Sequence, residues 1–149
     1  MAVRFQVVID CHDPRRLVAF WSSALRYQPE PPPQGFADWG AYWRSMGVAE
    51  EEIRGVTSPE SIVDPKGEGP RIWFHAVPEA KTCKNRLHFD IKASGGRELP
   101  LETRKGRVEA EASRLEKLGA VRLETLYEEG LDHYAVAMTD PEGNEFDIN

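Results

Sequence analysis

Hydrophobic and polar residues alternate along the first stretch of the chain, over 3–10, and this period of two predicts a strand. An Asp-Pro pair follows and predicts the start of a helix over 14–25, in which apolar residues recur at helical spacing. Further strands are predicted over 41–44 and 71–77. The stretch 48–70 between them is acidic and rich in Gly, Pro and Ser, which favours a loop.

The second half of the chain repeats this order of elements. Its predicted elements are a strand over 86–92, a connector over 95–106, a helix over 107–118 and strands over 121–124, 134–138 and 145–149. The two halves show little similarity residue by residue, but the shared order of strand, helix and strands indicates an internal repeat. We therefore expect one domain over 1–149, with module 1 at about 1–80 and module 2 at about 84–149.

Composition narrows the class of protein. The chain has 149 residues, of which 40% are hydrophobic and 30% charged, as in an ordinary globular protein. A net charge of −6 disfavours nucleic-acid binding. No apolar run approaches the ~20 residues of a membrane span, and no signal-peptide core follows the first Met, so we expect a cytoplasmic protein without membrane contact. Two cysteines are too few for a cysteine-based zinc site.

Three stretches carry a resemblance to a known family: 8–14 running on to 20–21, 84–90, and the closing Asp-Pro-Glu-Gly-Asn turn with its strand over 140–147. In these stretches the chain resembles glyoxalase-like members of the vicinal oxygen chelate superfamily. That superfamily includes glyoxalase I, bleomycin-resistance proteins, fosfomycin-resistance enzymes and extradiol dioxygenases. The resemblance implies an α+β fold of two βαβββ modules that form a cupped, incomplete mixed β-barrel with helices on the convex side. It also leads us to expect a homodimer.

The resemblance implies a divalent metal held by one residue in each of four strands, at the positions occupied here by Gln6, His75, His88 and Asp147. Strand alternation gives a separate reason to group them. If the apolar neighbours pack beneath the helices, all four side chains face the opposite way. Two imidazoles, a carboxylate and an amide oxygen suit Zn, Ni, Fe, Mn or Co. The alternative is a polar, ligand-binding face without a metal.

The implied activity is that of a metal-dependent enzyme, of isomerase, lyase or oxygenase type, which acts on a small organic substrate with vicinal oxygens. Asp90 and Asp147 are the candidate catalytic carboxylates, although Asp90 could instead form a salt bridge with Arg86 or Lys92. Glyoxalase I activity is disfavoured, because that enzyme would need a carboxylate where this chain has His75. The alternative is a metal-free protein that sequesters a small molecule, as bleomycin-resistance proteins do.

A dioxygenase is the less favoured form of the enzyme hypothesis. His75, His88 and Asp147 form a combination that suits non-haem iron. The extradiol dioxygenases, however, carry histidine at the position of Gln6. Some large side chains could line a ligand site, although core packing is the alternative for at least two of the aromatic residues at 39, 42 and 43. The expected lining residues are Trp73, Val77, Tyr42, Trp43 and Arg86. The stretch 48–70 is either a lid or an insertion.

Overall fold

The structure, a computed structural model, describes residues 3–53 and 58–149. The chain divides into two compact units, Met1–Glu79 (unit 1) and Ala80–Asn149 (unit 2). The division lies next to the predicted module boundary.

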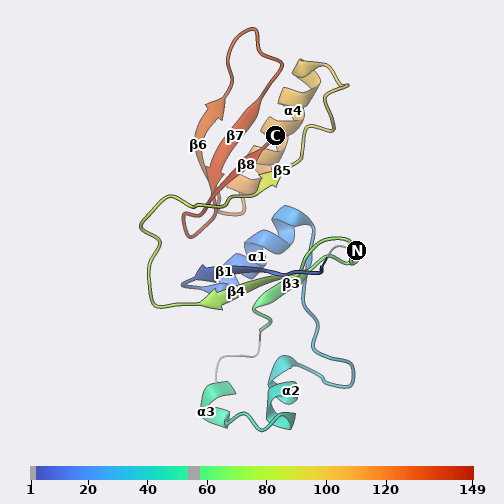
Figure 1. The fold of residues 1–149 in the computed structure, drawn as a ribbon, viewed down its shortest axis with the longest axis vertical. Helices are drawn as coiled ribbons and strands as arrows, with labels where there is room; N and C mark the ends of the chain where they lie inside the picture. The colour runs from blue at the N-terminus through green and yellow to red at the C-terminus, as the bar shows by residue number, and fades with distance from the viewer. Residues whose placement is uncertain (1–2, 54–57) are drawn as a thin grey trace. The chain divides into compact units, whose positions relative to one another are not determined.

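Unit 1 contains a four-stranded sheet with the strand order β1-β4-β3-β2 (Figure 1). β1 and β4 run parallel, and the other neighbours are antiparallel. Figure 1 shows α1 alongside the β1–β4 pair. In chain order the elements are β1 (Val7–Cys11), α1 (Pro14–Leu25), β2 (Gln28–Pro29), α2 (Trp39–Ser45), α3 (Glu50–Ile53), β3 (Ser61–Val63) and β4 (Ile72–Ala76).

Unit 2 repeats this topology, with the strand order β5-β8-β7-β6 and a parallel β5–β8 pair. The helix α4 packs on β6, β7 and β8. In chain order the elements are β5 (Asp90–Ile91), α4 (Leu101–Glu116), β6 (Val121–Leu126), β7 (Ala135–Thr139) and β8 (Glu145–Ile148). The shared strand order confirms the α+β class and the two βαβββ modules. Each parallel pair needs the long crossover that the helix and two strands provide.

The helix α1 forms where the sequence predicts it, because the cap at its N-terminus and its apolar stripe indicate the same helix. The Asp13 side chain accepts a hydrogen bond from the backbone N–H of Arg16 at 3.2 Å, which satisfies a free donor of the first turn. Leu17, Phe20 and Trp21 are buried against the sheet, where Phe74 and Ile62 of β4 and β3 are also inaccessible. This packing forms the core of unit 1.

The segment around Trp43 is helical, and the prediction of a strand over 41–44 is wrong. α2 begins after Asp38, whose side chain accepts a hydrogen bond from the backbone N–H of Ala41 at 2.7 Å. The aromatic residues at 39, 42 and 43 follow the i, i+3, i+4 spacing of one helix face. The stretch 48–70 is also not simply a loop, because it includes α3 and β3. Within it, residues 54–57 lie outside the described part of the chain.

In unit 2 the helix α4 begins at Leu101, so the predicted connector over 95–106 is too long. Arg104, in the first turn of α4, is buried although it carries a charge. Its guanidinium pairs with the Asp132 carboxylate and donates to the carbonyl of Leu99 at 3.0 Å. These contacts replace the water that a buried charge loses.

Two apolar residues that were expected to pack beneath the helices are exposed. Phe5 precedes β1 and is 72% exposed, and Leu87 precedes β5 and is 87% exposed. Phe74, Phe146 and Ile148 are fully buried, as the alternation predicts. No helix within residues 3–53 and 58–149 combines the length and the apolar character that a membrane span requires.

Candidate functional site

The four predicted metal ligands divide evenly between the units. Gln6 and His75 belong to unit 1, and His88 and Asp147 belong to unit 2. Convergence of all four on one ion stays a prediction.

In unit 2 the strand register places acidic side chains on one face. Asp90 pairs with Asp147, and Ile91 pairs with Ile148, in the parallel ladder of β5 and β8. Ile148 is buried beneath the helix layer, so Asp90 and Asp147 face the opposite way. The imidazole of His88 joins them. Its Nε2 lies 3.6 Å from Asp147 Oδ2 and 3.6 Å from Asp90 Oδ1.

This donor set fits a divalent cation. One ligand atom from each of His88, Asp90 and Asp147 lies within 4.8 Å of the other two. Donors held about 2.0–2.2 Å from an ion at tetrahedral angles lie roughly 3.4 Å apart, close to the 3.6 Å separations seen here. An imidazole with two carboxylates suits the borderline ions from Mn²⁺ to Zn²⁺.

Asp90 also has partners other than a metal. Its Oδ2 accepts hydrogen bonds from Lys92 Nζ at 3.1 Å and from Asn149 Nδ2 at 2.9 Å, while Oδ1 faces His88. Burial raises the pKa of the Asp90 carboxyl, but the bonds from Lys92 and Asn149 outweigh it and leave the pKa below its usual value. A carboxylate that acts as a general base near neutral pH needs a raised pKa. The lowered pKa therefore favours the alternative that the sequence left open, a salt bridge with Lys92.

Glu145 is a residue of this region that the sequence did not single out. It begins β8, two positions before Asp147, and its Oε2 accepts a hydrogen bond from the backbone N–H of Asn85 at 2.9 Å. Lys81 Nζ lies 3.0 Å from the same oxygen. The backbone bond, assisted by Lys81, lowers the pKa of Glu145 to about 2. Glu145 thus ties the segment that carries His88 to the strand that carries Asp147.

In unit 1, Gln6 and His75 share a face but lie at opposite ends of the strand pair. The register pairs Val7 with Ile72 and Asp10 with His75, so Gln6 is level with Arg71. Four strand positions, about 13 Å, separate the levels of Gln6 and His75. His75 Nδ1 lies 3.1 Å from Asp10 Oδ1.

A hydrogen-bond network fixes the side chain of Gln6. Arg71 Nη1 donates to Gln6 Oε1 at 2.8 Å, and Arg71 Nη2 donates to Ser61 Oγ at 2.8 Å. The charge of the guanidinium is matched by Glu30, which lies 2.6 Å from Nη2. Burial raises the pKa of Glu30, but hydrogen bonds from Arg71 and Ser61 outweigh it and hold the pKa below its usual value. The amide oxygen that a metal would need is therefore already bonded to a cation.

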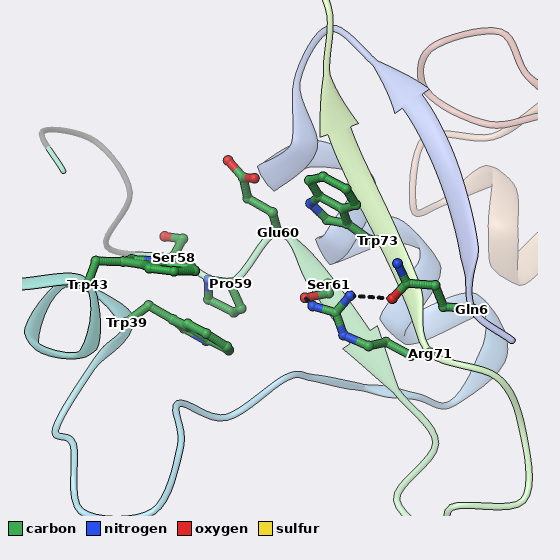
Figure 2. Close-up of a pocket in the computed structure, with 9 residues that line it drawn as sticks. All are labelled: Gln6, Trp39, Trp43, Ser58, Pro59, Glu60, Ser61, Arg71 and Trp73. Atoms are coloured by element: carbon green, nitrogen blue, oxygen red, sulfur yellow. Dashed lines mark hydrogen bonds between the residues drawn. The ribbon is translucent and has the colours of Figure 1, made fainter. Parts of the chain in front are cut away.

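The same network lies at one wall of a pocket of about 340 Å³ in unit 1. Trp43 and Trp73, both predicted as lining residues, line it, and Trp39 joins them (Figure 2). Tyr42 instead packs edge-on against Trp39, with ring centroids 5.8 Å apart. Among the described lining residues of this pocket, Val77 is absent. Arg86, which belongs to unit 2, is exposed.

A second pocket, of about 550 Å³, lies in unit 2 beside the candidate metal ligands. Asp90, Lys92 and Asn149 line its edge, and Arg97 and Arg104 add positive charge. Of the three residues His88, Asp90 and Asp147, Asp90 lines this pocket. Among the described residues, His88, Asp90 and Asp147 (the acidic cluster) have ligand atoms close enough together to hold a metal ion.

These features define a class of protein: paired βαβββ modules, each with a polar face on its parallel strand pair. The sequence places the chain within that class, because residues 6–149 match the family described as a glyoxalase-like domain. The chain belongs to this family. Among curated proteins, none matches it.

Solved structures of other proteins share the fold. A glyoxalase/bleomycin resistance protein/dioxygenase family enzyme from Burkholderia phytofirmans PsJN is 17% identical, with a TM-score of 0.58 over 97% of this chain and 94% of the other. The fosfomycin resistance protein FosX from Mesorhizobium loti is 9% identical, with a TM-score of 0.57 over 99% and 91% of the two chains.

A third neighbour was solved with its ligands. A mutant of FosX from Listeria monocytogenes, complexed with Mn(II) and 1S,2S-dihydroxypropylphosphonic acid, is 9% identical, with a TM-score of 0.59 over 100% of this chain and 90% of the other. At these identities the likeness concerns the fold alone.

Proposed function

We propose that this glyoxalase-like protein is a divalent-metal-dependent enzyme, of isomerase, lyase or oxygenase type, which acts on a small organic substrate with vicinal oxygens. The observation that carries the proposal is the acidic cluster, in which an imidazole nitrogen and two carboxylate oxygens lie within 4.8 Å of one another. The Mn(II) complex of the FosX neighbour from Listeria monocytogenes is consistent with metal chemistry on this fold.

His88 and Asp147 would hold the ion, and Asp90 would either join them or keep its bond to Lys92. When bound, a divalent ion polarises substrate oxygens and stabilises the negative charge of an enolate-like transition state. The carboxylates then have the task of moving a proton. We favour Asp147 over Asp90 for that task, because Lys92 and Asn149 already occupy Oδ2 of Asp90. Glyoxalase I activity is not expected.

The test is metal binding at the acidic cluster. Purified protein is stripped with EDTA, and Mn²⁺ and Zn²⁺ are then titrated by calorimetry, with elemental analysis of the loaded protein. We expect one ion per chain, at least tenfold weaker binding in His88→Ala and in Asp147→Asn, and unchanged binding in the control His12→Ala. The proposal fails if the wild-type protein takes up no ion, or if the two cluster variants bind as tightly as the control.

Metal-free sequestration of a small molecule is the second candidate, and features of unit 1 favour it. Gln6 Oε1 already accepts a hydrogen bond from Arg71, and an aromatic pocket lies beside this pair. This function requires quenching of tryptophan fluorescence by a ligand in the presence of EDTA, with no metal at any loading. A homodimer, a cytoplasmic location and the metal roles of Gln6 and His75 stay predictions.

A further inference from the structure

The pocket of unit 1 has walls of different chemistry. Trp39 and Trp43 of α2 lie on one side, and Trp73, Arg71 and Gln6 lie on the other (Figure 2). The pocket measures about 340 Å³, which is near the lower end of the range for small-molecule sites. Its size therefore suits a ligand of one or two fused rings.

Two stacked indole rings form the aromatic side of the pocket. The rings of Trp39 and Trp43 stack with centroids 5.9 Å apart and an interplanar angle of 29°. The indole Nε1–H of Trp39 donates to the carbonyl oxygen of Glu30 at 3.0 Å, which fixes the plane of that ring. Planar ligands gain most from such surfaces, because they stack in an offset or edge-to-face arrangement.

The opposite wall offers hydrogen-bond donors without excess positive charge. Glu30 neutralises Arg71, and one Nη1 hydrogen of Arg71 is used by the amide oxygen of Gln6. Within the described part of the chain, the second Nη1 hydrogen of Arg71 and the NH₂ group of Gln6 have no partner. Both are donors, so a ligand that meets this wall needs an acceptor such as a carbonyl oxygen.

The net charge of the pocket comes from Glu60. Glu60 lines the pocket next to Ser61, and its carboxylate has no ion pair among residues 3–53 and 58–149. With Arg71 matched by Glu30, one negative charge remains. That charge repels anionic ligands, whereas a cation gains from both the carboxylate and the indole faces.

We propose that the unit 1 pocket binds a planar aromatic compound of one or two rings that is uncharged or cationic and carries a hydrogen-bond acceptor. The ring lies against Trp39 and Trp43, and the acceptor meets Arg71 and Gln6. The inference rests on the second candidate function, metal-free binding of a small molecule, and it names the class of that ligand. It does not depend on a bound metal.

The experiment compares two probes of the same size by calorimetry in EDTA: 2-naphthamide, which is uncharged, and 2-naphthoate, which is anionic. We expect the amide to bind and the carboxylate to bind about tenfold more weakly. Glu60→Gln should reduce that preference to about twofold, because it removes the charge and keeps the shape. Equal binding of the two probes to the wild-type protein, or no binding of the amide at millimolar concentration, would overturn the proposal.

Two further variants locate the site. Trp43→Ala should weaken 2-naphthamide at least tenfold, whereas Trp43→Phe should retain most of the binding because a flat ring remains. Tyr127→Leu, at an exposed aromatic residue of unit 2, is the matched control and should leave binding unchanged. Equal binding by Trp43→Ala and the wild-type protein would refute the assigned position. Because EDTA is present, a failure of metal uptake at the acidic cluster would not affect these results, and the two proposals fail separately.

Discussion

Glu145 provides the most direct test of how unit 2 assembles its acidic cluster. Its carboxylate accepts the backbone N–H of Asn85, three residues before His88, and lies 3.0 Å from Lys81 Nζ. Glu145→Gln removes the charge and nearly preserves the shape. We expect the variant to be less stable at neutral pH and to bind Mn²⁺ more weakly, because the segment that carries His88 loses its tie to β8.

The magnitude follows from the pKa of Glu145, which falls from an ordinary value of 4.5 to about 2 in the folded protein. That difference corresponds to about 3–4 kcal/mol of folding free energy as an upper bound. Since the folded pKa is the lower one, the stabilisation is complete above about pH 4.5. It is lost as the pH falls from there toward 2. The glutamine variant should therefore differ most from the wild-type protein at pH 7 and little at pH 2.5.

The assay is urea denaturation followed by far-UV circular dichroism at pH 7 and pH 2.5, with hydrogen exchange of the β8 amides. All four tryptophans lie in unit 1, so tryptophan fluorescence serves as an internal reference. Glu128→Gln, at an exposed residue of unit 2, is the matched control. A deficit of the same size at both pH values, or no deficit at pH 7, would refute the role assigned to the Glu145 charge.

Three further predictions concern caps and ion pairs. Asp13→Ala removes the N-cap of α1 and should cost about 1 kcal/mol, read from urea denaturation by tryptophan fluorescence; an unchanged midpoint contradicts it. Lys92→Met releases Asp90 from its ion pair and should tighten Mn²⁺ binding severalfold by calorimetry, whereas weaker binding would contradict a metal at this cluster. Arg71→Met leaves Glu30 without its cation and should destabilise unit 1 by about 1–3 kcal/mol at pH 7, and by less at pH 4, where the unpaired carboxyl is protonated.

Local signals account for the parts of the fold that were predicted correctly. The Asp13 cap and the apolar stripe that follows it determine α1, and alternation determines β4 and β8. The prediction of a strand over 41–44 is wrong because aromatic residues favour strands by propensity and fit a helix face equally well by spacing. Asp38, an N-cap residue just before α2, was the signal that could have decided the case.

The candidate site was harder to predict because its contacts join distant positions. The bond between Asn85 and Glu145 spans 60 residues, and that between Arg71 and Glu30 spans 41. Neither pair follows a period that a window of the sequence can show. The alternation correctly placed Asp147 opposite the buried Ile148, since that depends only on neighbours within one strand.

The two repeated units carry different chemistry beside their parallel strand pairs. In each, the first and last strands form a parallel pair. Gln6 and Arg71, just before β1 and β4, present hydrogen-bond donors in unit 1, whereas the pair in unit 2 presents carboxylates from Asp90 and Asp147. Unit 2 therefore presents a set of metal ligands, and unit 1 is suited to an acceptor group on a flat ring. Because the fold is shared, the difference comes from the side chains alone. Exchanging Gln6 for Glu should accordingly weaken the binding of 2-naphthamide without affecting Mn²⁺ uptake at the acidic cluster.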